Sequence, residues 1–544
     1  MFCSSIRPSL WLGLLLFQAC DLPSVAASPC AACHPREVAL YSHSAMSHSL
    51  RRAGREPEGA FEHAFSGTRF TIYSDQTGLW QRMERDGDVS QYRVEYVVGS
   101  GKHASGYLVR IGDHLFQSPI CFYTRLGRYD MAPGSEATRD PDYIRPVTEE
   151  CVLCHSGKPL PIEGTLNEYE TPAFAPESIS CERCHGDPSR HLKAPLPGSI
   201  VNPAKLPMAA RNSVCEQCHL KGAVRVLNPG KKFEDFHPGE ALESVFTIFT
   251  AAVPANAPRE TIKVISQAEE LALSLCARKS NGRLWCGTCH DPHSSASQPD
   301  DYYRARCLTC HERTLASGRS LGRAHSPESG SPHPDGVRGN CVGCHMEKQN
   351  AKDGGHTVFT DHRISRRPAA HPEQTEGNGP SDGAELVAWR PPASELRERN
   401  LALAYTEAGA ETDSASNILR GYQMLAGLEK RFSSDPAVLD ALGESLLRIR
   451  RPLDAAGYFE RVLKLGPDSA ATESAAGTAW MQAGHTERAV GHLERALQLD
   501  PLLLPAAEAL MQVYRRQGDS DKLAALGERV REAMGASAPQ EAGQ

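Results

Sequence analysis

The pentapeptide Cys286-Gly287-Thr288-Cys289-His290 is one of seven Cys-x-x-Cys-His sequences in this chain of 544 residues. Two thiols three positions apart lie on one side of a helical turn, where both can add to the vinyl groups of one porphyrin. The histidine that follows then lies beneath the iron as its proximal ligand. This spacing is typical of the attachment site of a c-type haem, so the sequence predicts seven covalently bound haems c.

The predicted haem-binding residues are the two cysteines and the histidine of each motif. The first cysteines are Cys30, Cys151, Cys181, Cys215, Cys286, Cys307 and Cys341. The second cysteines are Cys33, Cys154, Cys184, Cys218, Cys289, Cys310 and Cys344. The proximal histidines, which we expect to bind iron, are His34, His155, His185, His219, His290, His311 and His345.

Other uses of a Cys-x-x-Cys pair fit this pattern poorly. A structural zinc ion takes four ligands, so the motifs would have to combine in twos, and their number is odd. Iron–sulfur clusters need cysteines without an obligatory histidine, and thiol–disulfide catalysis needs a single motif. Of the 18 cysteines, only Cys3, Cys20, Cys121 and Cys276 lie outside the motifs.

The N-terminus has the pattern of a secretory signal. Arg7 precedes an apolar run at 10–17, and the small residues Val25-Ala26-Ala27 offer a cleavage site, so residues 1–27 are expected to be removed. The alternatives are a buried N-terminal helix or a lipid anchor at Cys20, whose flanking residues match a lipidation sequence poorly. We expect a periplasmic or secreted protein with no transmembrane segment in its mature chain.

Composition limits the partners and the kind of core. A net charge of −7 argues against nucleic acid and anionic membrane surfaces as partners. Aromatic residues make up only 6% of the chain, so we expect porphyrins to supply much of the apolar surface, with loops and short helices around them. In an oxidising compartment Cys121 and Cys276 could form a disulfide or stay as two buried thiols, and the sequence leaves both open.

The haem motifs all fall within residues 28–364, which we predict to be one multihaem cytochrome domain, mainly α with little regular structure. Residues 61–130 lack motifs and favour a small antiparallel β insert, because the segments 70–73, 92–98 and 107–111 are β-branched and aromatic. Asp86-Gly87 and Gly99-Ser100-Gly101 are expected turns. Residues 365–394 are rich in proline and glycine and are predicted to be a linker that few contacts cross.

The segment 395–535 is rich in alanine and leucine and repeats with a period of 34 residues. Gly443 recurs as Gly477 and Phe459 as Leu493, while Pro467 recurs as Pro501. This resembles the tetratricopeptide repeat, with two clear units at 436–467 and 470–501 and degenerate units at 396–435 and 504–535. We therefore predict an α-solenoid that could dock a partner, followed by a disordered tail at 536–544.

What fills the sixth position of each iron decides between a carrier and a catalyst. Met46 is a possible thioether ligand, although packing against a porphyrin edge suits it better. His325 and His333 compete for one position between the sixth and seventh motifs. The distal ligands predicted from sequence context are His63, His103, His191, His293, His333, His356 and His362.

Several stretches resemble the multihaem cytochromes with doubled Cys-x-x-Cys-His motifs, related to the cytochrome c-554 and hydroxylamine oxidoreductase lineage. They include 96–103, 179–186, 200–204, 286–293, 344–346 and 356–364. The resemblance spans roughly residues 28–535, and many members also end in tetratricopeptide repeats. It implies stacked, mostly bis-histidine haems. Carriers and reductases share this scaffold, so the resemblance does not choose between them.

Two functions therefore stay open. The first is an electron-transfer cytochrome, and the second is an oxidoreductase of a small nitrogen or sulfur compound such as nitrite, hydroxylamine or tetrathionate. Related nitrite reductases mark their catalytic haem with Cys-x-x-Cys-Lys, which this chain lacks. Hydroxylamine oxidoreductases carry eight haems and a tyrosine crosslink, whereas this chain has seven motifs. Both departures favour the carrier.

Overall fold

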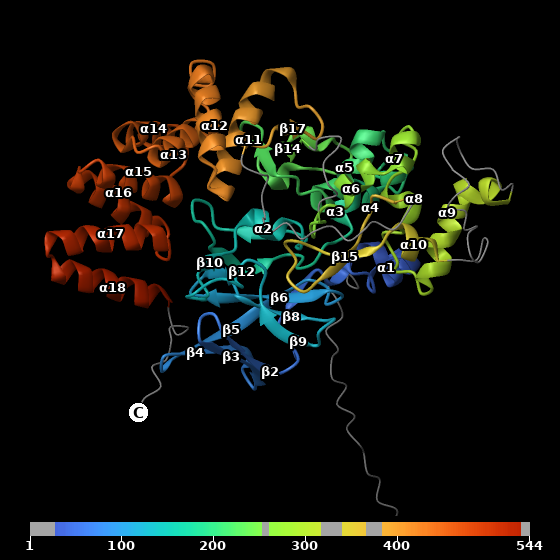
Figure 1. The fold of residues 1–544 in the computed structure, drawn as a ribbon, viewed down its shortest axis with the longest axis horizontal. Helices are drawn as coiled ribbons and strands as arrows, with labels where there is room; N and C mark the ends of the chain where they lie inside the picture. Colours follow the sequence, from blue (N-terminus) through green and yellow to red (C-terminus); the bar gives the residue numbers. More distant parts are fainter. Residues whose placement is uncertain (1–27, 253–260, 317–339, 366–382, 535–544) are drawn as a thin grey trace, which may run out of the picture.

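The computed structural model describes residues 28–252, 261–316, 340–365 and 383–534. The expected signal at 1–27, His325, His333 and the tail at 536–544 lie outside these residues. Figure 1 shows three regions: a β-sheet built by the N-terminal part, a cluster of short helices, and a C-terminal row of helical hairpins. Within the described residues no helix is long and apolar enough to cross a membrane.

The N-terminal part forms a large antiparallel sheet of ten strands, in the order β10-β7-β6-β5-β4-β3-β2, with β1 on β5, and β8 joining β6 to β9. The strands are β1 Leu50–Arg52, β2 Gly59–His63, β3 Thr68–Asp75, β4 Gly78–Arg85, β5 Asp88–Val98, β6 Ala104–Ile111, β7 His114–Gln117, β8 Ile120–Tyr123, β9 Arg128–Met131 and β10 Arg145–Pro146. The sheet thus extends beyond the predicted insert at 61–130 on both sides.

The predicted turn at Asp86-Gly87 closes the β4–β5 hairpin. Arg85 pairs with Asp88 across it, and both turn residues have positive φ, 53° and 94°. A two-residue loop with this backbone matches the right-handed twist of the strands, which is why Asp-Gly suits the position. The turn holds β4 and β5 in register. Phe70, Ile72, Leu79, Val94 and Val109 then meet in one buried core.

Short helices and loops carry the cysteine motifs. The helices are α1 Pro35–Tyr41, α2 Glu149–Leu153, α3 Glu182–His185, α4 Ser189–Lys193, α5 Met208–His219, α6 Gln267–Leu273, α7 Leu275–Lys279, α8 Cys286–Cys289, α9 Pro299–Ala316 and α10 Cys341–His345. Small sheets join them: β11 Pro159–Pro161 with β12 Tyr169–Phe174, β13 Val224–Leu227 with β14 Phe246–Ala251 and β17 Leu386–Ala388, and β15 Lys348–Asn350 with β16 Val358–Thr360.

The C-terminal region consists of helical hairpins, as the 34-residue period predicts. Its helices are α11 Arg397–Thr412, α12 Ala415–Leu428, α13 Pro436–Arg448, α14 Pro452–Leu465, α15 Ala470–Gln482, α16 Thr486–Leu499, α17 Leu504–Gln517 and α18 Ser520–Met534. The repeated glycines lie where the helices cross. A Cβ at Gly443 would lie 2.7 Å from the Phe459 ring, and one at Gly477 would lie 2.6 Å from Leu493.

The expectation that few contacts cross residues 365–394 is wrong for the described part of that stretch. Leu386–Ala388 forms β17, which pairs with β14. Trp389 Nε1 donates to Glu216, and Arg390 donates to Glu243 and Ser213. A three-residue strand is too short to show a period, which is why the sequence pattern did not predict it.

The repeats also share buried cores with the N-terminal part at both of their ends. At one end Val224, Val226 and Phe249 pack with α11 side chains, including Tyr405. At the other end Leu502 packs in the core of the large sheet, with Val530, Ala533 and Met534 of α18 beside it. The helical region is therefore part of the same packed body, as Figure 1 shows.

Candidate haem-binding site

One cavity of about 3890 Å³ is lined by every Cys-x-x-Cys-His motif of the chain. All fourteen motif cysteines and all seven motif histidines contribute to its wall. A single small-molecule site typically measures roughly 300–1,000 Å³, so this space has room for several large groups. Motifs as far apart in sequence as those at Cys30 and Cys341 thus meet in one place.

Local hydrogen bonds give the motifs the geometry that haem attachment requires. The histidine amide donates to the carbonyl of the first cysteine from His34 to Cys30 at 2.8 Å, from His185 to Cys181 at 2.9 Å, and from His290 to Cys286 at 2.8 Å. This is a helical i to i−4 bond. It brings the two thiols and the imidazole to one turn, as the sequence spacing predicts.

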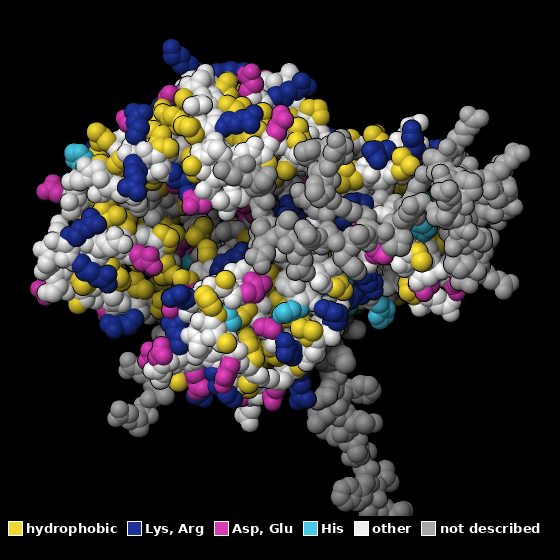
Figure 2. Space-filling view, viewed as in Figure 1, with side chains coloured by type: hydrophobic (Ala, Val, Ile, Leu, Met, Phe, Trp, Pro, Cys, Tyr) yellow, Lys and Arg dark blue, Asp and Glu magenta, His cyan; other side chains and the backbone are white. Residues whose placement is uncertain are grey.

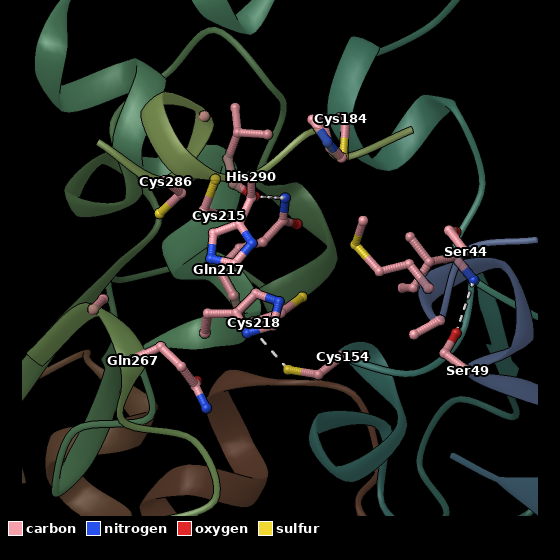
Figure 3. A pocket seen from close by; sticks show the side chains of 18 of the residues that line it. Ser44, Ser49, Cys154, Cys184, Cys215, Gln217, Cys218, Gln267, Cys286 and His290 are labelled. Atoms are coloured by element: carbon pink, nitrogen blue, oxygen red, sulfur yellow. Dashed lines mark hydrogen bonds between the residues drawn. The ribbon is translucent and has the colours of Figure 1, made fainter. Parts of the chain in front are cut away.

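Thiols from different motifs lie next to one another. The neighbouring Cys218 thiol lowers the pKa of Cys154. The neighbouring Cys215 thiol likewise lowers the pKa of Cys286. Figure 3 shows Cys215 and Cys286 beside His290, with Cys154 close to Cys218. Haems attached to adjacent motifs would therefore lie close together.

The cavity histidines have their Nδ1 atoms held by oxygen atoms. Nδ1 of His185 is 2.8 Å from the Val201 carbonyl, and Nδ1 of His345 is 2.7 Å from that of Ser365. The Tyr303 hydroxyl lies 3.2 Å from Nδ1 of His290. Such partners fix the ring and leave Nε2 to bind a metal, the usual arrangement around metal-bound histidine. No sequence signal pointed to Tyr303, which lies on the following helix.

The same feature marks three of the predicted distal ligands. Nδ1 of His191 is 2.8 Å from Ser199 Oγ, and Nδ1 of His362 is 2.9 Å from the Thr360 carbonyl. His293 Nδ1 lies 3.4 Å from the Asp291 carboxylate. Each of these three histidines lines the cavity.

Three pairs of imidazole rings have centroids about 6 Å apart; the planes are nearly parallel in two pairs and tilted in the third. The ring centroids of His34 and His191 are 6.3 Å apart, with an angle of 22° between planes. Those of His185 and His293 are 6.0 Å apart at 17°.

The third pair, His290 and His362, is 6.1 Å apart at 33°. Burial lowers the pKa of His155, His185, His219 and His362, and it lowers that of His290 to about 4. These five imidazoles are therefore neutral near pH 7, the form that binds a metal.

The other predicted distal ligands are placed differently. His103 lines the cavity, and its ring stacks on Phe359 with centroids 4.4 Å apart. His63 is not among the lining residues, and both of its ring nitrogens are occupied, by Ser66 Oγ and the Glu136 carbonyl. His356 is also outside the lining and contacts Asp130 at 3.3 Å.

Three further residues singled out in the sequence also line the cavity. Cys121 and Cys276 are free thiols, so in this structure they are not joined by a disulfide. Met46 packs against Val38 and Tyr41. Among the residues that the structure describes, no three His, Cys, Asp or Glu side chains form a metal-binding group. A haem iron takes only one or two protein side chains, because the porphyrin supplies the rest.

In comparison with known proteins, one stretch of the chain that contributes to the site matches a protein family. The family described as cytochrome c554 and c-prime matches residues 130–186, which contain the second and third motifs. No curated protein matches the chain.

Among solved structures, MamA 41-end from Desulfovibrio magneticus RS-1 is 20% identical, with a TM-score of 0.23, and the match covers 25% of this chain and 77% of that chain. A structure described as MamA MSR-1 C2 is 18% identical, with a TM-score of 0.23, covering 26% of this chain and 79% of that chain. Over residues 130–186 the chain is thus similar to a family of c-type cytochromes, and that similarity implies covalently bound haem c.

Proposed function

We propose that this chain is a multihaem c-type cytochrome that carries seven covalent haems and transfers electrons between partner proteins. The observation that carries the proposal is the convergence of all seven motifs on one cavity. The predicted signal at 1–27 supports export to the periplasm or beyond, where c-type haems are attached. The family match at 130–186 supports the type of cofactor.

Haem c, when bound, supplies a one-electron couple of iron. The protein residues do the rest. The cysteine pairs tether each porphyrin, and the motif histidines hold the irons with rings that Val201, Ser365 and Tyr303 orient. The closeness of thiols such as Cys154 and Cys218 keeps neighbouring groups within transfer distance.

Partner docking is the role that we propose for the outer surface of the helical hairpins. Their ends are already engaged with the rest of the protein, so only the surface left uncovered is available. On the face seen in Figure 2 acidic and basic side chains are interspersed, so partner recognition there would depend on local complementarity.

The number of haems tests the proposal directly. Denaturing mass spectrometry of the purified protein should give the polypeptide without residues 1–27 plus seven haem masses. Replacing Cys30 and Cys33 with serine should remove one haem. The matched control, Cys121→Ser with Cys276→Ser, should retain all seven, because these thiols lie outside the motifs. A parent protein with few or no covalent haems would refute the proposal.

The oxidoreductase alternative predicts a different spectrum. An enzyme needs an iron with an open position, which gives a high-spin ferric signal in electron paramagnetic resonance and binds carbon monoxide when reduced. An electron carrier should show mostly low-spin haems. A full equivalent of high-spin haem in the parent protein would favour an enzyme acting on a small nitrogen or sulfur compound.

A further inference from the structure

Each of the three histidine pairs joins the proximal ligand of one motif to a histidine that follows a different motif. His34 belongs to the first motif, whereas its partner His191 follows the third motif by six residues. His185 belongs to the third motif, and its partner His293 follows the fifth by three residues. The pairs therefore connect motifs in a regular way.

The third pair continues the series. His290 belongs to the fifth motif, and His362 lies on the segment that leaves the seventh motif. The short hairpin of β15 and β16 folds this segment back, with Lys348 paired with Thr360. The histidine pairs thus connect the first motif to the third, the third to the fifth, and the fifth to the seventh.

The separation within each pair suits an iron between two imidazoles. Two metal–nitrogen bonds of roughly 2 Å each, together with the distances from nitrogen to ring centre, place the ring centroids about 6 Å apart. The observed separations are 6.0–6.3 Å. By contrast, the rings of His103 and Phe359 stack directly on each other with centroids 4.4 Å apart.

The Nδ1 partners support the same arrangement. His185, His191, His290, His293 and His362 all have Nδ1 next to an oxygen atom. Their rings are therefore oriented with Nε2 available to the metal. For the first pair there is a further observation: the thiols of Cys30 and Cys181 are in contact, so the first and third motifs adjoin at their cysteines as well.

We propose that the iron held by His34 takes His191 as its sixth ligand, that the iron held by His185 takes His293, and that the iron held by His290 takes His362. The first, third, fifth and seventh motifs then form one row. The segment that follows the third, fifth or seventh motif supplies the distal ligand to the iron of the preceding motif in this row. This assignment rests on the proposed function, because it requires haem at the motifs.

Replacing single distal histidines tests the ligation. His191→Ala, His293→Ala and His362→Ala should each retain seven haems by mass and convert one haem equivalent from low to high spin. Each variant should also bind one equivalent of carbon monoxide beyond the parent, and added imidazole should restore the low-spin signal. His63→Ala is the matched control and should leave the spectrum unchanged, because both nitrogens of His63 are bonded outside the cavity.

Combining variants tests the pairing itself. In a protein with Cys30→Ser and Cys33→Ser, which lacks the first haem, His191→Ala should create no new high-spin signal, while His293→Ala still should. In a protein with Cys181→Ser and Cys184→Ser, which lacks the third haem, His293→Ala should create no new high-spin signal, while His191→Ala still should. The pairing is refuted if His191→Ala opens an iron in the absence of the first haem, or if the single variants keep seven low-spin haems.

The parent protein separates the two possible failures. If it carries no covalent haem, the proposed function fails. If it carries seven haems but the distal variants leave the spin states unchanged, only the ligand assignment fails. Where a cysteine double variant does not fold, imidazole titration of the single histidine variants still measures how many irons each substitution opens.

Discussion

Asp500 is the residue whose loss should most clearly show that the helical repeats and the sheet are one structure. Its side chain is fully buried between α16 and α17 and accepts three hydrogen bonds. His114 Nε2 of strand β7 donates at 2.7 Å, the amide of Leu166 at 2.9 Å, and the amide of Leu502 at 3.2 Å. Two of these donors lie more than three hundred residues away in sequence.

Asp500→Ala should destabilise the protein by about 3–5 kcal/mol, since it leaves a buried donor or charge without its partner. The largest part of this cost should come from the His114 ring, because its Nδ1 is already buried without a hydrogen bond and its Nε2 would lose its partner as well. Urea unfolding followed by the helical circular dichroism signal measures the change. Asp468→Ala is the control: its ion pair with Arg495 is about half exposed, and such pairs contribute roughly 0–1 kcal/mol.

A double-mutant cycle with His114→Ala isolates the contact between the two regions. Residues in one buried hydrogen-bonded pair show coupling energies of roughly 0.5–3 kcal/mol. If Asp500→Ala changes the free energy of unfolding by less than about 0.5 kcal/mol, a typical surface effect, the contact does not hold the regions together and the reasoning is wrong.

The same carboxylate predicts a pH dependence. Burial alone would raise the pKa of Asp500, but the hydrogen bonds from His114, Leu166 and Leu502 outweigh it, and the pKa is lowered. A group whose pKa is lower in the folded protein stabilises it above its unfolded pKa, near 4. That stabilisation is lost as the pH falls through the folded pKa. The parent should therefore lose more stability than Asp500→Ala in acid below pH ~4.

Two further predictions concern the repeats. Gly477→Ala should destabilise the protein by about 1–3 kcal/mol in urea unfolding, because its Cβ would lie 2.6 Å from Leu493, whereas Gly491→Ala, with no atom within 4 Å, should not. A chain that ends at residue 364 should aggregate or lose haem on purification, because it lacks β17 and the α11 side chains that cover Val224 and Phe249. A truncated protein that stays monomeric with a full set of haems would contradict this.

Local patterns were sufficient to predict the motifs and the repeats. A Cys-x-x-Cys-His turn is set by residues within one helical turn, and in the structure the His34 amide donates to Cys30 and the His290 amide to Cys286. The equivalence of Gly443 with Gly477 likewise predicts a close helix crossing, which the contacts with Phe459 and Leu493 confirm. Both signals depend on spacing alone.

Long-range pairing could not be predicted in the same way. Strands β7 to β10 are short, and proline is part of β10, so they show no clear alternation. The choice among the distal histidines depends on which loops meet across the cavity. His63 and His191 are both predicted as ligands, yet only His191 lines the cavity, because His63 on β2 bonds to Ser66 and Glu136.

The shared cores suggest why the two regions occur in one chain. The part of the chain that carries the motifs surrounds a cavity of about 3890 Å³, so much of its interior is not filled by side chains. Besides the core of the large sheet itself, close side-chain packing comes from the repeats, where α11 covers β13 and β14 and where Leu502 and α18 cover the large sheet. The helical hairpins thus support the region around the cavity at two places. On this argument haem attachment and folding of the repeats depend on each other, and a variant that weakens either one should weaken both.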